Sequence, residues 1–386
     1  MLKQIVEKKE KKVEYIELIY DLIFVYIIGR NNLLLHHTSG GYVDRNMFLS
    51  YLFCTLAIIQ IWTFTTYYIN VYGRKSVREH IFLFINMFLL YFMAKGIGSN
   101  WEEMHMQFHI SWALILLNIG VQYALEWRTH TEAAHRRRIK GMMAVLFTQA
   151  AIVSAANAEF HFFGTTYASF AAVLCGILMV LIFSRGSCEA LVDFNHLSER
   201  AMLYVVFTFG EMIIAIASYF EGKFTLGTLY FALLAFLIVV GLFLSYGVFY
   251  DYLIDKGKQT NGIGYMLLHI FLIFSLNNIT NALEFMREEH VDLLQKTVLL
   301  VFSFTSFYVA LFLAGLYAKK GLQPNGKLVI ASVLLSAGFV VLMIVFRERM
   351  YFGIALSVTY VAAMLLFILN FKNKLIKSQQ EVLEEK

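Results

Sequence analysis

The stretch VEYIELIYDLIFVYIIGRNNLLL, residues 13–35, decides how the rest of the sequence is interpreted. It is long enough to cross a bilayer as a helix, yet it contains Glu14, Glu17 and Asp21. Helical geometry puts these three carboxyl groups on one stripe, at i, i+3 and i+7. Acidic side chains are costly in hydrocarbon, so in a spanning helix they face a protein interior or a water-filled cavity. We therefore expect Asp21, the deepest of the three, to belong to a polar site.

The composition predicts a polytopic membrane protein. Of the 386 residues, 59% are hydrophobic and only 15% are charged, whereas a soluble domain has about 25% charged residues. The single proline, Pro324, lies outside the apolar segments, so any break in a spanning helix has to come from glycine. The first 15 residues lack the order of a cleavable signal, and we expect the first helix to direct insertion.

Apolar runs long enough to span a bilayer recur along the chain with polar interruptions. We predict about twelve transmembrane helices, near 14–36, 47–70, 80–98, 108–127, 141–158, 165–184, 200–220, 226–251, 263–285, 294–318, 327–346 and 351–371. The fold class is therefore an all-α polytopic helix bundle.

Lysine and arginine predict the orientation, because cytoplasmic loops carry an excess of both. They gather in alternate loops, for example at Lys8–Lys12, Arg74–Arg78, Arg136–Lys140, Lys319–Lys320 and Lys372–Lys377. The other loops hold only scattered examples. Both termini should accordingly be cytoplasmic.

The chain is predicted to form one transmembrane domain, residues 1–371, followed by a charged cytoplasmic tail, residues 372–386. The third span begins His80-Ile-Phe-Leu-Phe and the ninth contains His269-Ile-Phe-Leu-Ile. This offset indicates two parallel six-helix halves, 13–184 and 196–371, as in some transporters.

The seventh span, HLSERAMLYVVFTFGEMIIAIASYF, is the second informative stretch. Arg200 and Glu211 are eleven residues apart, which puts them on one helical face about 16 Å apart along the axis. Glu211 then lies near the bilayer midplane, where a carboxyl group is expected to be functional or to bond a neighbouring helix.

Residues 13–28 and 196–217 together resemble the two signature stretches of the bacterial low temperature requirement A family of membrane proteins. Further similar stretches are IWTFTTYYINVYGRKSVR after the second span, SYGVFYDYLID at the end of the eighth and YMLLHIFLIF in the ninth. The resemblance covers residues 13 to about 285. It implies a multi-pass protein connected with growth in the cold, and it supplies no substrate or reaction.

The family's polar residues, carried over position by position, fall on Glu17, Asp21, Asn70, Arg74, Glu199, Arg200, Glu211, Asp251 and His269. One departure is the loop after the second span, where residues 71–75 read VYGRK in place of the family's acidic stretch. The predicted topology puts most of these residues at the cytoplasmic ends of their helices. We expect them to line a polar cavity with Glu211 at its floor, or else to form a salt-bridged clamp.

No cofactor or metal site is predicted. Glu102, His105 and His109 have helical spacing suited to a metal. The sequence does not establish three firm ligands among them, so no metal site is assigned there. His36-His37 is a weaker candidate, and Asn277, Asn281 and Glu284 share a face of the ninth span. The three cysteines fit neither a disulfide framework nor a CxxC site, and no motif indicates nucleic-acid binding.

The preferred hypothesis is a secondary transporter or permease for a small solute, coupled to protons, with Asp21 and Glu211 as working carboxyls. Arg74 and Arg200 would be counter-charges or anion contacts. The alternative is a membrane-embedded enzyme acting on a lipid or lipid-linked substrate, against which no partnered nucleophile or nucleotide-binding loop is found. A non-catalytic sensor or scaffold is a third. Membrane lipids are expected partners, and the oligomeric state stays open.

Overall fold

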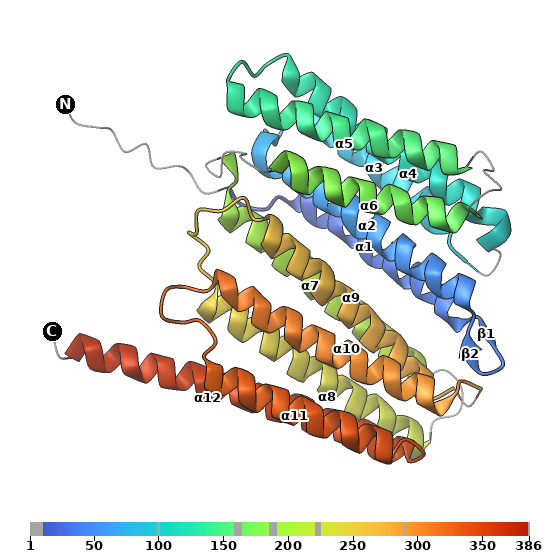
Figure 1. The fold of residues 1–386 in the computed structure, drawn as a ribbon, viewed down its shortest axis with the longest axis vertical. Helices are drawn as coiled ribbons and strands as arrows, with labels where there is room; N and C mark the ends of the chain where they lie inside the picture. Colours follow the sequence, from blue (N-terminus) through green and yellow to red (C-terminus); the bar gives the residue numbers. More distant parts are fainter. Residues whose placement is uncertain are drawn as a thin grey trace. The chain divides into compact units, whose positions relative to one another are not determined.

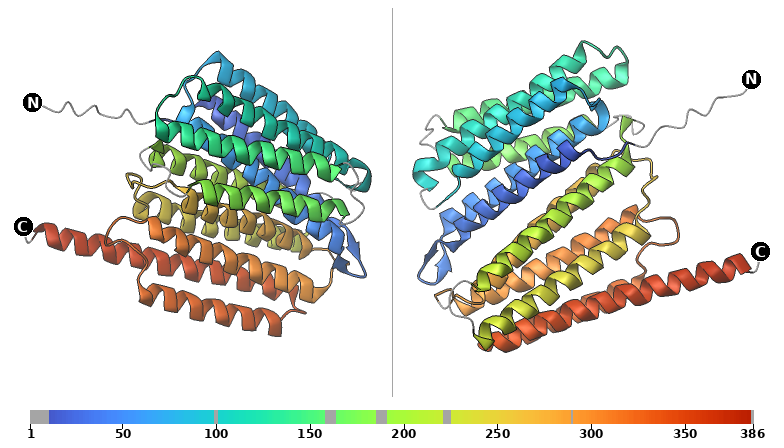
Figure 2. Two further views of the ribbon diagram at one scale, coloured as in Figure 1. Left: turned by 45° about the horizontal axis from the view of Figure 1, so that its top comes forward. Right: turned by 180° about the vertical axis from the view of Figure 1, so that it is seen from behind.

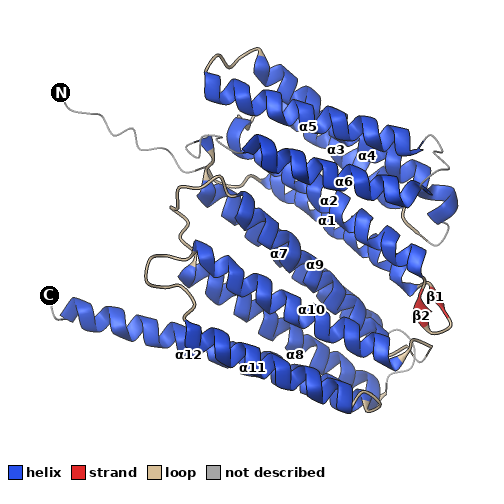
Figure 3. Cartoon of the chain, in the orientation of Figure 1, coloured by secondary structure: helices blue, strands red, loops and turns tan. Residues whose placement is uncertain are grey.

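The computed structural model describes residues 11–98, 101–157, 164–184, 191–220, 225–288 and 290–384. These residues form twelve α-helices and one short hairpin, so the predicted all-α architecture is confirmed. Figure 3 shows helices joined by loops, with β1 (Thr38–Ser39) and β2 (Tyr42–Val43) as the strands of the described chain.

The chain divides into two compact units. Unit 1 consists of residues 1–34, 48–203 and 256–263, and unit 2 consists of residues 35–47, 204–255 and 264–386. Helix α7 (Phe194–Ala217) contributes its beginning to unit 1 and its remainder to unit 2. The predicted relation between two parallel six-helix halves stays a prediction.

Unit 1 contains five complete helices and a sixth, α2, from residue 48 onwards, and these helices run side by side (Figures 1 and 2). They are α1 (Tyr15–Asn32), α2 (Arg45–Tyr72), α3 (Val77–Lys95), α4 (Trp101–Trp127), α5 (Ala133–Asn157) and α6 (Gly164–Ser184). Neighbours pack in the order α1–α3–α4–α5–α6. Helix α2 is the most buried of the candidate spans among the described residues, with 67% of its apolar window inside the structure.

Unit 2 contains the end of α7 and five further helices. These are α8 (Leu226–Val248), α9 (Ile263–Phe285), α10 (Leu293–Ala314), α11 (Gly326–Val345) and α12 (Met350–Glu384). Short elements follow α7, α8 and α10: η3 (Ser218–Phe220), η4 (Phe249–Leu253) and η5 (Gly315–Tyr317). Between α1 and α2 the chain forms η1 (Leu33–His36), β1 (Thr38–Ser39) and β2 (Tyr42–Val43). Helix α12 packs on α8 and α11, and its last turns extend past α11 in Figure 1.

Eleven helices of the described residues are long and apolar enough to cross a membrane, and residues 167–183 of α6 form a shorter apolar helix. Several helices extend beyond the predicted apolar runs, because polar residues form their first turns. Helix α3, for example, begins at a capping box in which the Ser76 side chain accepts from the Glu79 N–H at 3.3 Å. The one π-helical turn of the described chain, η4, follows Gly247 at the end of α8.

Candidate functional site

Two carboxylates of α1 hold one arginine of α7 inside unit 1. Arg200 Nη1 donates to Glu17 Oε2 and Arg200 Nη2 donates to Asp21 Oδ1, each over 2.5 Å. Glu17 and Asp21 are four residues apart on one helix face, so a single guanidinium reaches both. We call Glu17, Asp21 and Arg200 the Arg200 cluster.

The Arg200 cluster is removed from solvent. Asp21 and Arg200 are 0% exposed and Glu17 is 2% exposed. Trp62 of α2 donates its Nε1–H to Asp21 Oδ1 over 2.8 Å, and the guanidinium lies 5.9 Å from the centre of its ring. Asp21 Oδ2 and Arg200 Nε have no hydrogen-bond partner among the described residues. Two carboxylates therefore share one cation in a water-poor environment.

His196 lies between the Arg200 cluster and Asn70. Its Nε2 is 3.4 Å from Glu17 Oε2, and its Nδ1 is 3.1 Å from Asn70 Nδ2. Asn70 is held in turn by the backbone of Asp193, whose N–H donates to Asn70 Oδ1 and whose carbonyl accepts from Asn70 Nδ2. The predicted site residue Asn70 thus reaches Glu17 through His196, which was not among the predicted site residues.

A second charged cluster surrounds Glu126, in the last turn of α4, whose side chain is fully buried. Arg78 Nη2 donates to Glu126 Oε1, and Arg74 Nη2 donates to Glu126 Oε2 over 3.3 Å. His130 Nε2 lies 3.3 Å from the same Oε2. We call Glu126, Arg74, Arg78 and His130 the Glu126 cluster. Arg74, a predicted site residue, therefore pairs with Glu126 and lies outside the Arg200 cluster.

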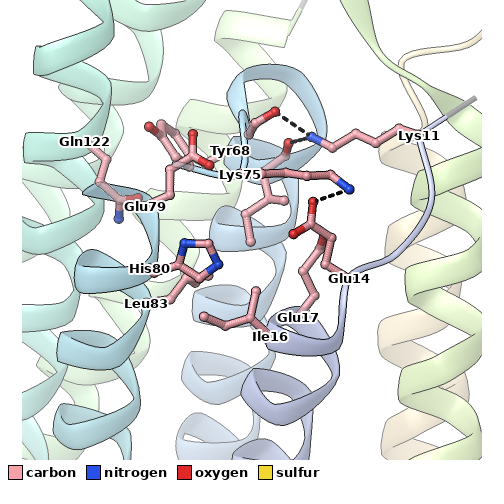
Figure 4. A pocket seen from close by; sticks show the side chains of 12 residues that line it. Lys11, Glu14, Ile16, Glu17, Tyr68, Lys75, Glu79, His80, Leu83 and Gln122 are labelled. Carbon is pink, nitrogen blue, oxygen red and sulfur yellow. Dashed lines mark hydrogen bonds and ion pairs between the residues drawn. The ribbon is translucent and has the colours of Figure 1, made fainter. Parts of the chain in front are cut away.

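A narrow pocket opens beside Glu17 (Figure 4). Its polar lining comes from Lys11, Glu14, Glu17, Tyr68, Lys75, Glu79, His80 and Gln122. The free space is about 20 Å³, which is room for about one ordered water. This conformation therefore admits a water or a small ion and no metabolite.

Two lysines line the outer part of this pocket. Figure 4 shows Lys11 extending from the N-terminal segment towards the carbonyl groups of Ile69 and Gly73, where it caps the end of α2. Lys75 Nζ lies 3.0 Å from Glu14 Oε1. Burial lowers the pKa of Lys11, and the neighbouring carboxylates, Glu17 first, oppose that effect.

Glu199 is half-buried on α7 and makes no side-chain hydrogen bond or ion pair with any described residue. It is adjacent in sequence to Arg200 without joining the Arg200 cluster. Adjacent residues on a helix point about 100° apart, which accounts for this difference.

Three predicted site residues belong to unit 2. Glu211 is half-buried, and the carboxylate of Glu284 is close enough to interact with it electrostatically. Asp251 is exposed in η4. His269 is buried, with Nδ1 2.9 Å from the Tyr265 carbonyl and Nε2 3.1 Å from the Tyr246 hydroxyl. Both nitrogens of His269 are therefore occupied. The single cavity predicted to join these residues to those of unit 1 stays a prediction.

The weaker sequence candidates also find partners. His109 bonds the His105 carbonyl and the Ser169 hydroxyl through its two ring nitrogens, while the side chain of Glu102 lies outside the described residues. His36 lies between Glu284 and Glu288, at 3.2 and 3.0 Å. Among the described residues, no group of three or more His, Cys, Asp or Glu side chains could hold a metal ion.

Some residues in or beside the two clusters were not among the predicted site residues, although the sequence pattern pointed to part of them. His196 is four residues before Arg200, a spacing that puts both on one face of α7. Trp62 and Arg78 carry no such local signal, because their partners come from other helices. Glu126 follows a long apolar run directly, which marks a carboxyl at a helix end but does not show what neutralises it.

The apolar helices and the buried ion pairs define a multi-pass helical membrane protein. The sequence profile of the bacterial low temperature requirement A protein (LtrA) matches residues 12–370. The chain belongs to this family, which confirms the resemblance noted from the sequence. No curated protein matches the chain.

Proposed function

We propose that the protein is a secondary transporter or permease for a small solute, coupled to protons, and that the Arg200 cluster is its charge-exchange site. One observation supports this above all: a fully buried arginine is shared by two carboxylates. A structural clamp needs only one carboxylate for one guanidinium. A second buried carboxylate adds a desolvation cost, which a transporter recovers when a positive charge binds.

The pocket beside Glu17 supports an access route to this site. Glu17 belongs both to the pocket lining and to the Arg200 cluster. Two segments rich in lysine and arginine lie at helix ends: residues 74–78, between α2 and the first turn of α3, and residues 136–140, in the first turns of α5. By the positive-inside rule these helix ends are cytoplasmic. The proposed route therefore opens to the bacterial cytoplasm, with both chain termini on the same side of the inner membrane.

Helix α7 supports coupling between the site and the rest of the protein. The same helix that carries Arg200 in unit 1 continues into unit 2, where it carries Glu211. A charge change at Arg200 acts on α7 directly, and a rigid helix transmits the displacement along its length. In this proposal Glu211 is a second carboxyl that responds to the state of the Arg200 cluster.

The test is charge movement in proteoliposomes on a solid-supported membrane, with pooled metabolites and pH jumps as stimuli. We expect wild-type protein to give a substrate-dependent current that Asp21→Asn and Glu17→Gln abolish. Glu199→Gln is the matched control, because it neutralises a carboxyl next to Arg200 that lies outside the cluster. Currents that survive in both cluster variants would reject the Arg200 cluster as the exchange site.

A membrane-embedded lipid enzyme is the second candidate, and one observation favours it. Arg74 and Arg78 are half-exposed at helix ends, with 51% and 37% of their side chains accessible, where they could hold a lipid phosphate. Under this alternative, a deletion strain shows altered lipid composition, and wild-type protein gives no current under any gradient. A connection with growth in the cold, which the family's description carries, fits either function.

A further inference from the structure

The hydrogen bonds around His196 determine which of its nitrogens carries the proton. The Asp193 N–H donates to Asn70 Oδ1 over 3.0 Å. This hydrogen bond fixes the orientation of the Asn70 amide, because only its oxygen can accept from an N–H group. Asn70 Nδ2 therefore carries the donors, one to the Asp193 carbonyl at 2.8 Å and one towards His196 Nδ1 at 3.1 Å. An imidazole nitrogen that accepts a hydrogen bond has no proton. The proton of His196 is on Nε2, which faces Glu17.

This arrangement keeps His196 uncharged. An imidazolium needs protons on both nitrogens, and a proton on Nδ1 would point at the Asn70 N–H group. Charging His196 would therefore break its bond to Asn70. With His196 neutral, Glu17, Asp21 and Arg200 together carry one unbalanced negative charge.

The charged groups around the Arg200 cluster do not remove that imbalance. On the pocket side, Lys75 pairs with Glu14, and Lys11 is shared between Glu17 and Glu79, so these two lysines face three carboxylates. His80 Nδ1 donates to the Ser76 carbonyl, 2.8 Å away, and its side chain makes no ion pair among the described residues. Asp193 precedes α7, where the helix dipole stabilises a carboxylate. Tyr20 is hydrogen-bonded to the Thr65 hydroxyl, and a tyrosine is uncharged near neutral pH because the usual pKa of a phenol is about 10.

We infer that the Arg200 cluster binds one monovalent positive charge, a proton or an alkali cation, and that Asn70 maintains this charge count by holding His196 as a neutral imidazole. Asp21 Oδ2 is the binding atom, because it is fully buried and has no hydrogen-bond partner among the described residues. The cluster then becomes electrically neutral. The inference gives the charge of the coupling ion and its binding atom, and it rests on the proposed transport function only for its physiological role.

The charge count predicts which variants lose the bound charge. Either Asp21→Asn or Glu17→Gln leaves one carboxylate for one guanidinium, so both variants should bind nothing. Asp251→Asn is the matched control, because Asp251 is an exposed carboxyl in unit 2. If the cluster had only a structural role, the Asp21 and Glu17 variants would have no reason to lose charge binding alike.

Infrared difference spectroscopy of the purified full-length protein tests this count. The protein is acidified from about pH 9 to about pH 5, a range above the titration of exposed carboxylates. We expect one protonated-carboxyl band per chain in wild type and in Asp251→Asn, and its loss in both cluster variants. A band that persists in both cluster variants overturns the inference.

The same spectra in sodium chloride and in choline chloride distinguish the two ions. A band of equal size in both salts assigns a proton, whereas a band seen only in choline assigns an alkali cation that excludes the proton. Absence of the band in both salts overturns the inference, because the cluster then keeps its negative charge.

Nitrogen-15 NMR of histidine-labelled protein tests the role of Asn70 separately. The His196 signals are assigned by their loss in His196→Gln. We expect an unprotonated Nδ1 and a protonated Nε2 throughout the pH range in wild type, and a second protonation on acidification in Asn70→Leu. A wild-type His196 that is protonated on Nδ1 rejects the role of Asn70, whether or not the protein transports a solute.

Discussion

The Arg200 cluster and the Glu126 cluster lie in the same unit and use the same residue types in opposite ratios. The first has two carboxylates for one arginine, all fully buried. The second has one buried carboxylate for two arginines whose side chains are 51% and 37% exposed. Water can solvate the excess charge of the second cluster but not that of the first.

This difference separates a structural role from an exchange role. Glu126 receives hydrogen bonds from Arg74, Arg78, Thr129 and Tyr68, so its carboxylate is saturated at the end of α4. Asp21 keeps one oxygen without a partner among the described residues. We conclude that the Glu126 cluster connects α4 to the first turn of α3 and to the loop before it, whereas the Arg200 cluster has capacity for a further positive charge.

The largest expected effect comes from removing the buried cation. Arg200→Met leaves two carboxylates unpaired, which should lower the free energy of unfolding by about 3–5 kcal/mol. Arg74→Met is the matched control and should cost less than about 1 kcal/mol, because Arg74 is half-exposed and Arg78 still pairs with Glu126. Denaturant unfolding in detergent measures both variants. Equal losses in the two variants would contradict the comparison.

A smaller loss is expected from neutralising the buried carboxylate of the Glu126 cluster. Glu126→Gln keeps the shape of the side chain but weakens its charge-assisted hydrogen bonds, at a cost of about 1–3 kcal/mol. The same unfolding assay measures it, with Glu199→Gln expected within about 0.5 kcal/mol of wild type. An unchanged stability in Glu126→Gln would remove the structural role assigned to this cluster.

The opposite sign is expected for the same chemical change in the Arg200 cluster. Asp21→Asn balances the buried charges and retains an oxygen for Trp62 and Arg200, so it should raise the free energy of unfolding by about 1 kcal/mol. It should at the same time abolish proton-coupled current. A variant that loses stability as Glu126→Gln does would show that both clusters are structural.

The smallest expected effect on the free energy of unfolding concerns Glu288, a carboxylate near solvent in unit 2. It serves as a solvent-accessible reference for the buried carboxylates of the two clusters. Burial opposes its ionisation, but the hydrogen bond from His36 and the charges of His36, His290 and Lys296 prevail, so its pKa lies below the usual 4.5. Glu288 therefore stabilises the fold above pH 4.5, and this contribution disappears as the pH falls through the lowered value.

Acid unfolding of wild type and Glu288→Gln measures this contribution. The two stability curves should be separated at neutral pH and converge on acidification, since protonated Glu288 and glutamine are then equivalent. Curves that stay parallel down to low pH would assign the difference to lost packing.

Sequence reasoning located the helices and included all three residues of the Arg200 cluster among the candidates, without showing how they pair. Apolar runs mark spans because an unsatisfied backbone cannot enter hydrocarbon, and the spacing of Glu17 and Asp21 fixes their common face. The sequence did not show how carboxyls and arginines at one predicted depth divide into separate pairs. Arg74 pairs with Glu126, 52 residues away in the chain, and no periodicity within one helix indicates which other helix supplies a partner.

By itself, the sequence determined the class of the protein, its helices, its family and the face on which α1 carries its acids. These properties follow from local hydrophobicity and from the fixed geometry of the α-helix. Only the tertiary structure decided that Arg200 lies between Glu17 and Asp21, that Asn70 orients His196, and that Glu126 takes both nearby arginines. Such pairings depend on which helices pack together, because a buried charge is stabilised by whatever partner the packing brings within hydrogen-bond distance.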